Sequence, residues 1–132
     1  MDEALRHLSI SIGRPARVVY EYACLPQNFA KWASGLGEGL QRQGDSWLAD
    51  SAVGRVGIRF SEKNDFGVLD HWVSLPDGQT VYIPLRVIAN GDASELIFTL
   101  IRQPGMDDEK FTADAEWVMR DLHRLKDMLE AQ

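Results

Sequence analysis

The sequence predicts an α+β domain in which a curved antiparallel sheet of about seven strands wraps around a long C-terminal helix. One observation is that Asp107 to Glu130 reads as an amphipathic helix, because its apolar residues recur at spacings of four and three. They are Phe111, Ala115, Val118, Leu122, Leu125 and Leu129. The second is that residues 38–102 form short strand-like runs, the only block large enough to cover that helix. Two short helices are expected after the first strand.

The first strand and the two helices follow from local patterns. From His7 to Ile12, apolar residues alternate with polar ones, as in a strand with one buried face. Proline suits the first turn of a helix, where its missing N–H is no loss. Pro15 and Pro26 therefore begin two helices, of about Ala16 to Tyr22 and Gln27 to Ala33.

The middle of the chain consists of strands separated by turn residues. The clearest hairpin turn is Asn90-Gly91-Asp92, and Pro76-Asp77-Gly78 forms another turn. Pro104-Gly105 ends the last strand, after which Asp107 or Asp108 caps the long helix. The expected strands are Leu40 to Gln43, Trp47 to Ser51, Val56 to Glu62, Gly67 to Leu75, Thr80 to Ala89 and Glu95 to Arg102.

Composition restricts the classes of partner. Residues 1–132 are expected to form a single domain, with 45% hydrophobic and 26% charged residues. A formal net charge of −6 argues against nucleic acid and against anionic membrane surfaces as partners. No apolar run is long enough to span a membrane, and Met1 to Arg6 is charged where a signal peptide would become apolar. We therefore expect a cytoplasmic protein without membrane insertion.

The sequence offers little for a metal or a cofactor. Cys24 is the only cysteine, so one chain can form neither a disulfide nor a cysteine-based metal site. The histidines, His7, His71 and His123, are far apart and show no metal-binding spacing. We predict neither a metal site nor a cofactor.

Several stretches resemble the START-like, polyketide cyclase and dehydrase superfamily, SRPBCC. The run from Ile10 to Trp32, with "RPARVVYEYA" and "PQNFAKW", looks like the opening of that superfamily. The stretches "GVLDHWV", "IPLRVIANGDASELIFTLIRQPGMDDEKF" and "DLHRLKDMLE" are similar to bacterial members of it. The resemblance covers essentially the whole chain and implies the helix-grip fold with an internal pocket. Such families share the pocket but no common catalytic set, so the resemblance assigns no active site.

A cavity is expected between the sheet and the long helix, lined by aromatic and aliphatic residues. On the strand from Thr80, alternate residues face inward, and the resemblance places Trp32 at the pocket mouth. Trp117 lies off the apolar stripe, so it flanks the helix or contacts a partner, and a homodimer is one such partner. The predicted ligand-binding residues are Phe29, Trp32, His71, Val81, Ile83, Leu85, Phe98, Phe111, Val118 and Leu122.

The length of the turn after Leu75 decides which polar residue enters the cavity. A three-residue turn places His71 opposite Ile83 and turns it inward, whereas a two-residue turn places Asp70 and Trp72 inside. The sequence leaves both open. Asp70 and His71 point to opposite faces and cannot pair with each other.

Three classes of function are consistent with this pattern. The first is binding of a small hydrophobic or amphipathic ligand in the cavity, without turnover. The second is a cyclase or dehydratase type of enzyme on a polyketide-like or aromatic substrate, with His71 as the catalytic base beside an acidic group. Asp114 on the long helix lies beside the apolar stripe, within reach of the cavity rim, and Arg59 and Arg86 are candidate anchors for an acidic ligand. The third is an interaction protein whose core is filled by its own side chains.

Overall fold

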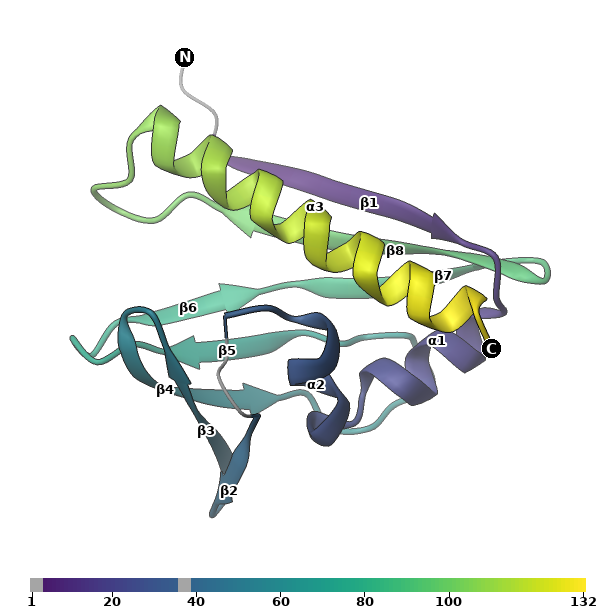
Figure 1. The fold of residues 1–132 in the computed structure, drawn as a ribbon, viewed down its shortest axis with the longest axis horizontal. Helices are drawn as coiled ribbons and strands as arrows, with labels where there is room; N and C mark the ends of the chain where they lie inside the picture. The colour runs from purple at the N-terminus through teal and green to yellow at the C-terminus, as the bar shows by residue number, and fades with distance from the viewer. Residues whose placement is uncertain (1–3, 36–38) are drawn as a thin grey trace.

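The long C-terminal helix packs along one of two small antiparallel sheets in the computed structural model, which describes residues 4–35 and 39–132. Figure 1 shows this helix, α3, running along β1, and it also contacts β8 and α2. In chain order the elements are β1 (Leu5–Ile12), α1 (Ala16–Ala23), α2 (Pro26–Trp32), β2 (Gln41–Gln43), β3 (Ser46–Ser51), β4 (Gly54–Phe60), β5 (His71–Ser74), β6 (Thr80–Ile83), β7 (Leu85–Asn90), β8 (Ala93–Ile101) and α3 (Asp108–Glu130).

The sheets divide the chain into two groups of strands. β1, β8 and β7 form a three-stranded sheet, and β2 to β6 form a five-stranded sheet in sequence order. Every pairing is antiparallel, as expected for strands joined by short turns. Within residues 4–35 and 39–132, no helix is both long and apolar enough to cross a membrane.

The prediction of one strand from Thr80 to Ala89 is wrong, because the chain breaks at Pro84 into β6 and β7. Proline has no N–H for a ladder hydrogen bond. The N–H of the next residue, Leu85, donates to the Asp70 carboxylate at 2.9 Å instead of to a strand. β6 therefore pairs with β5 and β7 with β8, which gives two sheets and eight strands in residues 4–35 and 39–132 instead of one sheet of about seven.

The strand predicted from Gly67 to Leu75 begins only at His71. Residues 67–70 instead connect the two sheets: the N–H of Leu69 donates to the carbonyl of Leu85, and that of Val87 donates to the carbonyl of Gly67. Gly67 has a φ of +71°, and a Cβ at this position would collide with the Val87 carbonyl. This crossing segment runs beside β7 and leads into β5, so it joins the three-stranded sheet to the five-stranded sheet.

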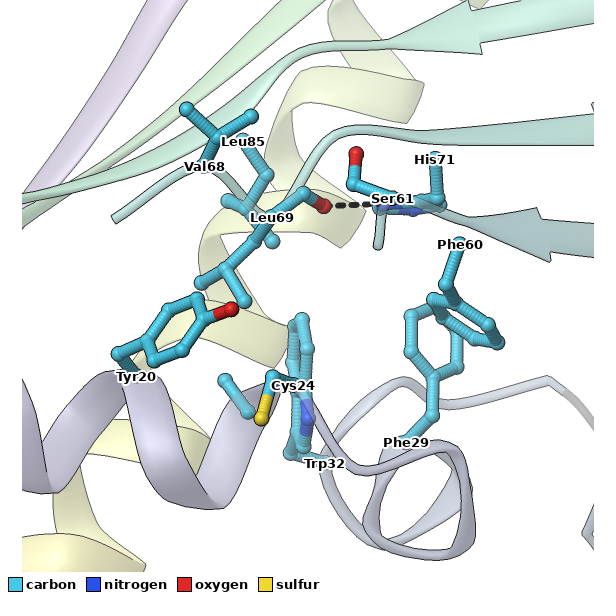
Figure 2. A pocket seen from close by; sticks show the side chains of 11 residues that line it. Tyr20, Cys24, Phe29, Trp32, Phe60, Ser61, Val68, Leu69, His71 and Leu85 are labelled. Carbon is cyan, nitrogen blue, oxygen red and sulfur yellow. Dashed lines mark hydrogen bonds between the residues drawn. The ribbon is translucent and has the colours of Figure 1, made fainter. Parts of the chain in front are cut away.

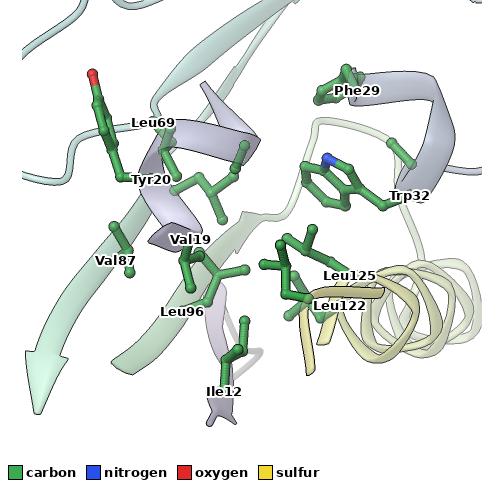
Figure 3. Close-up of a cluster of buried hydrophobic side chains, with 14 of the residues drawn as sticks. Ile12, Val19, Tyr20, Phe29, Trp32, Leu69, Val87, Leu96, Leu122 and Leu125 are labelled. Carbon is green, nitrogen blue, oxygen red and sulfur yellow. The ribbon is translucent and has the colours of Figure 1, made fainter. Parts of the chain in front are cut away.

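The prediction for the long helix is confirmed. α3 begins after Asp107, whose Oδ1 accepts a hydrogen bond from the N–H of Lys110 at 2.8 Å. Figure 3 shows Leu122 and Leu125 of α3 facing Trp32, with Leu96 of β8 nearby. All residues of the predicted stripe are buried except Val118, which is half-buried.

Candidate functional site

A cavity of about 200 Å³ lies between α2, the inner face of β4 to β6, β8 and the middle of α3. Seven of the residues predicted to bind a ligand line this cavity: Phe29, Trp32, His71, Ile83, Phe98, Val118 and Leu122. Its other walls come from the end of α2, from β4 and β5 and from α3, namely Ala33, Ser34, Val56, Ile58, Val73, Trp117 and Asp121. Most of these side chains are apolar, so the interior favours an apolar occupant.

The other three predicted residues lie elsewhere. Leu85 is fully buried and lines a smaller adjoining space. Val81 pairs with Val73 on β5 but is not among the described residues that line the 200 Å³ cavity. Phe111, also absent from that lining, is buried, and the guanidinium groups of Arg6 and Arg102 lie 5.2 and 4.7 Å from its ring centre.

The position of Phe111 follows from the length of α3. It lies seven residues before Val118, and an α-helix rises about 1.5 Å per residue, so the two are about 10 Å apart along the axis. The apolar stripe therefore predicted correctly which face of α3 carries Phe111, but it did not predict the position of Phe111 along the helix axis relative to the cavity. The inclusion of Phe111 among the cavity residues is corrected.

The turn at Pro76-Asp77-Gly78 has three residues, which settles the open register. His71 pairs with Ile83 across β5 and β6, and the N–H of Leu75 donates to the carbonyl of Gln79 at 2.8 Å. His71 therefore lies on the inner face and lines the cavity.

The environment of His71 fixes its protonation. The ring is 2% exposed, and its Nδ1 lies 3.1 Å from the carbonyl oxygen of Leu69, an interaction shown in Figure 2. A carbonyl oxygen can only accept, so Nδ1 carries the proton and Nε2 keeps its lone pair in the neutral ring. Burial lowers the pKa of His71 and outweighs the Leu69 carbonyl and the Asp70 charge, both of which raise it. The imidazole is thus neutral at pH 7.

A smaller space of about 10 Å³ adjoins the cavity and is drawn in Figure 2. It shares three walls with the larger cavity, namely Phe29, Trp32 and His71. The indole Nε1 of Trp32 is buried and has no hydrogen-bond partner in the described part of the chain. Leaving a buried donor without a partner costs about 1–3 kcal/mol.

Asp121 is a cavity residue that the sequence did not reveal. It is 8% exposed, and its Oδ1 accepts a hydrogen bond from the Ser34 hydroxyl at 2.6 Å. Burial raises its pKa, opposed by the hydroxyl and the backbone N–H of Ser34 and by the charges of Arg124 and Arg120. The available signal was its position four residues after Trp117 and three after Val118, which places all three on one side of the helix.

Asp114, the acidic residue considered at sequence level, lies outside the cavity. Its carboxylate pairs with the Lys110 ammonium at 2.7 Å, one helical turn earlier. The acidic residue of α3 that lines the cavity is therefore Asp121 and not Asp114.

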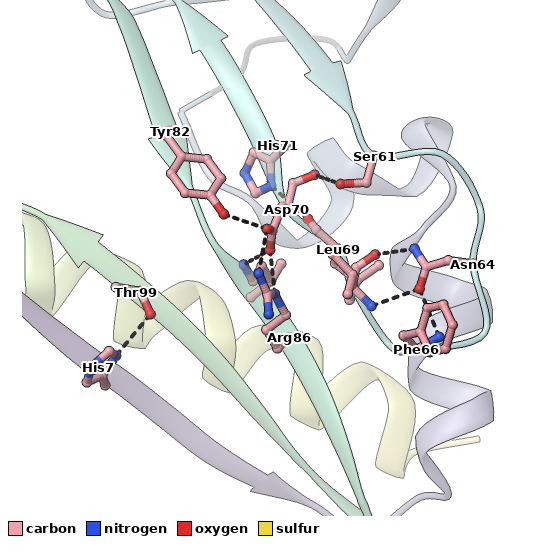
Figure 4. Close-up of polar contacts among 12 residues, drawn as sticks. His7, Ser61, Asn64, Phe66, Leu69, Asp70, His71, Tyr82, Arg86 and Thr99 are labelled. Atoms are coloured by element: carbon pink, nitrogen blue, oxygen red, sulfur yellow. Dashed lines mark hydrogen bonds and ion pairs between the residues drawn. The ribbon is translucent and has the colours of Figure 1, made fainter.

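The two candidate anchors for an acidic ligand both lie on the outer side of the sheets. The guanidinium of Arg59 lies 4.7 Å from the ring centre of Trp72, and Trp72 stacks on Tyr82. Arg86 donates to both carboxylate oxygens of Asp70, each at 2.8 Å, as Figure 4 shows. Neither arginine is among the described residues that line the cavity.

Asp70 holds the junction between the two sheets. Besides Arg86, the Tyr82 hydroxyl and the Leu85 N–H donate to its carboxylate, at 2.6 and 2.9 Å. Burial raises the pKa of Asp70, but these hydrogen bonds and the Arg86 charge outweigh it and lower the pKa to about 2. With its acceptor positions occupied, Asp70 stabilises the fold and makes no pair with His71.

The remaining histidines lie away from the cavity. His7 bonds Thr99 across β1 and β8, with 3.0 Å between Nδ1 and Oγ1, and His123 is exposed on α3. Within the described ranges, no three His, Cys, Asp or Glu side chains are grouped as metal ligands would be. Cys24 caps α1 and is half-buried, with its Sγ 3.6 Å from the Glu21 carbonyl.

Comparison with solved structures shows which proteins share this fold. A START superfamily protein from Mycobacterium smegmatis matches with a TM-score of 0.67 and 11% identity, over 96% of this chain and 97% of its own. CV1439 from Chromobacterium violaceum matches with a TM-score of 0.73 and 16% identity, over 97% and 99%. DynU16, from the dynemicin biosynthetic locus, matches with a TM-score of 0.72 and 19% identity over 98% of this chain, which spans only 48% of DynU16.

These likenesses agree with the resemblance seen in the sequence. The chain has the START-like, helix-grip fold. Comparison of the sequence with protein-family models and with curated proteins gives no match. At identities of this order a structural likeness defines the fold alone, so function has to be argued from the cavity.

Proposed function

We propose that this protein binds a small, mainly apolar or amphipathic molecule in the cavity between the sheets, α2 and α3. The observation that carries the proposal is the volume of about 200 Å³ with its largely apolar lining. An apolar protein cavity of about 150 Å³ is known to bind benzene, so this one suits a molecule of about one ring. The volume supports binding over a core filled by its own side chains.

Ligand titration with a blocked cavity tests the proposal. Val118 is half-buried at the cavity wall, so Val118→Phe directs a ring into the space. We expect toluene and similar one-ring probes to bind the native protein and to bind this variant about tenfold more weakly or worse. The measurement is the set of chemical-shift changes in ¹H–¹⁵N NMR spectra during titration.

The matched control is Val53→Phe, at a position that is 67% exposed in the turn between β3 and β4. This variant should bind the probes as the native protein does. If no apolar probe of one or two rings binds the native protein, the proposal is wrong and the filled-core alternative takes its place.

A cyclase or dehydratase type of activity is the second candidate, favoured by the position of His71. A neutral imidazole with a free Nε2 lone pair lies in the same cavity wall as the Asp121 carboxyl. Such a base can remove a proton from a carbon next to a carbonyl, the step that begins ring closure or water loss in polyketide-like substrates. The likeness to DynU16, from a biosynthetic locus, supports a role of this kind.

Proton exchange measures this chemistry without knowledge of the substrate. Cyclohexanone in D₂O should exchange its α-protons faster with the native protein than with His71→Gln, in proportion to the protein concentration. His7→Gln, at the histidine outside the cavity, is the matched control and should keep the native rate. Equal rates for the native protein and His71→Gln would exclude His71 as a base.

A further inference from the structure

We infer that the ligand is a neutral one-ring molecule of the phenol class, whose hydroxyl group donates a hydrogen bond to Nε2 of His71. This inference rests on the proposed function and adds a chemical class to it. Three features of the cavity carry it: the acceptor of His71, the adjoining space of about 10 Å³ beside its ring and the absence of a cation among the described lining residues.

His71 requires a donor. Its Nδ1–H is used by the Leu69 carbonyl, so only the lone pair of Nε2 remains for a ligand. Nε2 makes no hydrogen bond within the described part of the chain and is not among its fully buried unpaired atoms, so it has accessible surface. A ligand without an O–H or N–H would leave this acceptor unpaired, and burying an unpaired polar group is unfavourable.

The rings around His71 leave room for a hydroxyl group. The rings of Trp32 and His71 both contact Phe29, with ring centres 5.2 and 5.3 Å from the Phe29 ring centre. These three rings also bound the adjoining space of about 10 Å³, close to the 10–15 Å³ needed by one water-sized group. A hydroxyl group has that size, so the group that donates to His71 fits at this wall.

The charged groups that line the cavity favour a neutral ligand. No lysine or arginine is among the described residues lining the cavity, whereas the Asp121 carboxyl is. An anionic ligand would lose its hydration without gaining a cation, which costs several kcal/mol. A phenolic hydroxyl, with a pKa of about 10, stays neutral at pH 7.

Three probes of matched shape separate these requirements: 4-methylphenol, p-xylene and 4-methylbenzoate. p-Xylene replaces the hydroxyl by a methyl group, and 4-methylbenzoate replaces it by a carboxylate. We expect 4-methylphenol to bind the native protein about three- to tenfold more tightly than p-xylene, the contribution of one net hydrogen bond. 4-Methylbenzoate should not bind measurably.

The imidazole ¹⁵N resonances provide a readout that affinity alone does not. The chain has three histidines, so His7→Leu and His123→Leu assign the resonances of His71 by elimination. 4-Methylphenol should shift the Nε2 resonance of His71 upfield, as acceptance of a hydrogen bond does, whereas p-xylene should not. This measurement uses the native protein and needs no variant at His71 to fold.

Variants at His71 complete the test. His71→Leu should reduce the preference for 4-methylphenol over p-xylene to about one, while His7→Leu, outside the cavity, should keep it. Equal or tighter binding of p-xylene by the native protein would overturn the inference and leave the proposed function standing. Tight binding of 4-methylbenzoate would overturn the neutral class, and failure of all three probes to bind would overturn the proposed function as well.

Discussion

Asp70 and His71 are neighbours at the start of β5, but their side chains have opposite electrostatic surroundings. Asp70 is surrounded by donors and has its pKa lowered to about 2, whereas His71 is enclosed by aromatic rings and has its pKa lowered by burial. For Asp70 the charged form is stabilised, and for His71 the neutral form is. Adjacent residues thus serve different purposes, one for the fold and one for the cavity.

Asp70→Asn should lower the free energy of unfolding by about 1–3 kcal/mol at pH 7, because it weakens four hydrogen bonds at the sheet junction. The folded pKa of about 2 lies below the usual 3.8, so this stabilisation is present above pH 3.8 and is lost as the pH falls through 2. Urea denaturation at pH 7 and near pH 2 measures it. Asp50→Asn, at an exposed pair with Arg55, is the control and should change little.

Asp121→Asn should show the opposite sign. Burial raises the pKa of Asp121 in the folded state, so its carboxylate form is less favourable there than in the unfolded chain. The amide should therefore stabilise the protein at pH 7, by less than about 1 kcal/mol, and the gain should vanish below the unfolded pKa of about 4. Denaturation curves across this pH range decide the sign. A loss of stability at pH 7 would contradict this account of Asp121.

At the scale of elements, α3 and the segment that crosses between the sheets define the interior. α3 supplies the largest buried stripe, and residues 67–70 connect the three-stranded and five-stranded sheets. The strand break at Pro84 separates β6, on the cavity side, from β7, in the other sheet. The cavity therefore depends on where strands stop as much as on what they contain.

Leu125→Ala should cost about 2–5 kcal/mol, because Leu125 is fully buried where α3 meets the core. Glu116→Ala, on the exposed face of the same helix, serves as the control and should change stability by less than about 0.5 kcal/mol. Thermal or chemical denaturation measures both. Similar values for the two variants would show that α3 is not docked as described.

Gly67→Ala should destabilise the protein by at least about 2 kcal/mol more than Gly78→Ala. Both glycines have positive φ, at +71° and +92°, so both variants strain the backbone. Only at position 67 would the added Cβ also collide, with the Val87 carbonyl. The difference between their free energies of unfolding measures the cost of this collision. Equal losses of stability would mean that the crossing segment shifts to make room for the added Cβ.

At the scale of the whole molecule, the START-like fold holds, within the described residues, two sheets and three helices around a cavity of about 200 Å³. Side chains from α2 and α3, which are far apart in the sequence, line one side of this cavity. Trp117 covers part of this boundary: it lines the cavity, is 48% exposed and lies against the backbone at Gly35. Its partial exposure fits its position off the apolar stripe, and a homodimer through this face stays a prediction.

The sequence by itself determined the order of the helices and of most strands, the long helix with an aspartate cap at its start, and the inward faces of the strands around Ile83 and Phe98. These features depend on local periodicity and turn residues, which act within a few positions of the chain. Only the tertiary structure decided the break at Pro84, the register that turns His71 inward, and the entry of Asp121 instead of Phe111 into the cavity. Each of these depends on a contact between distant segments, such as Leu85 with Asp70 or Ser34 with Asp121, which local patterns do not specify.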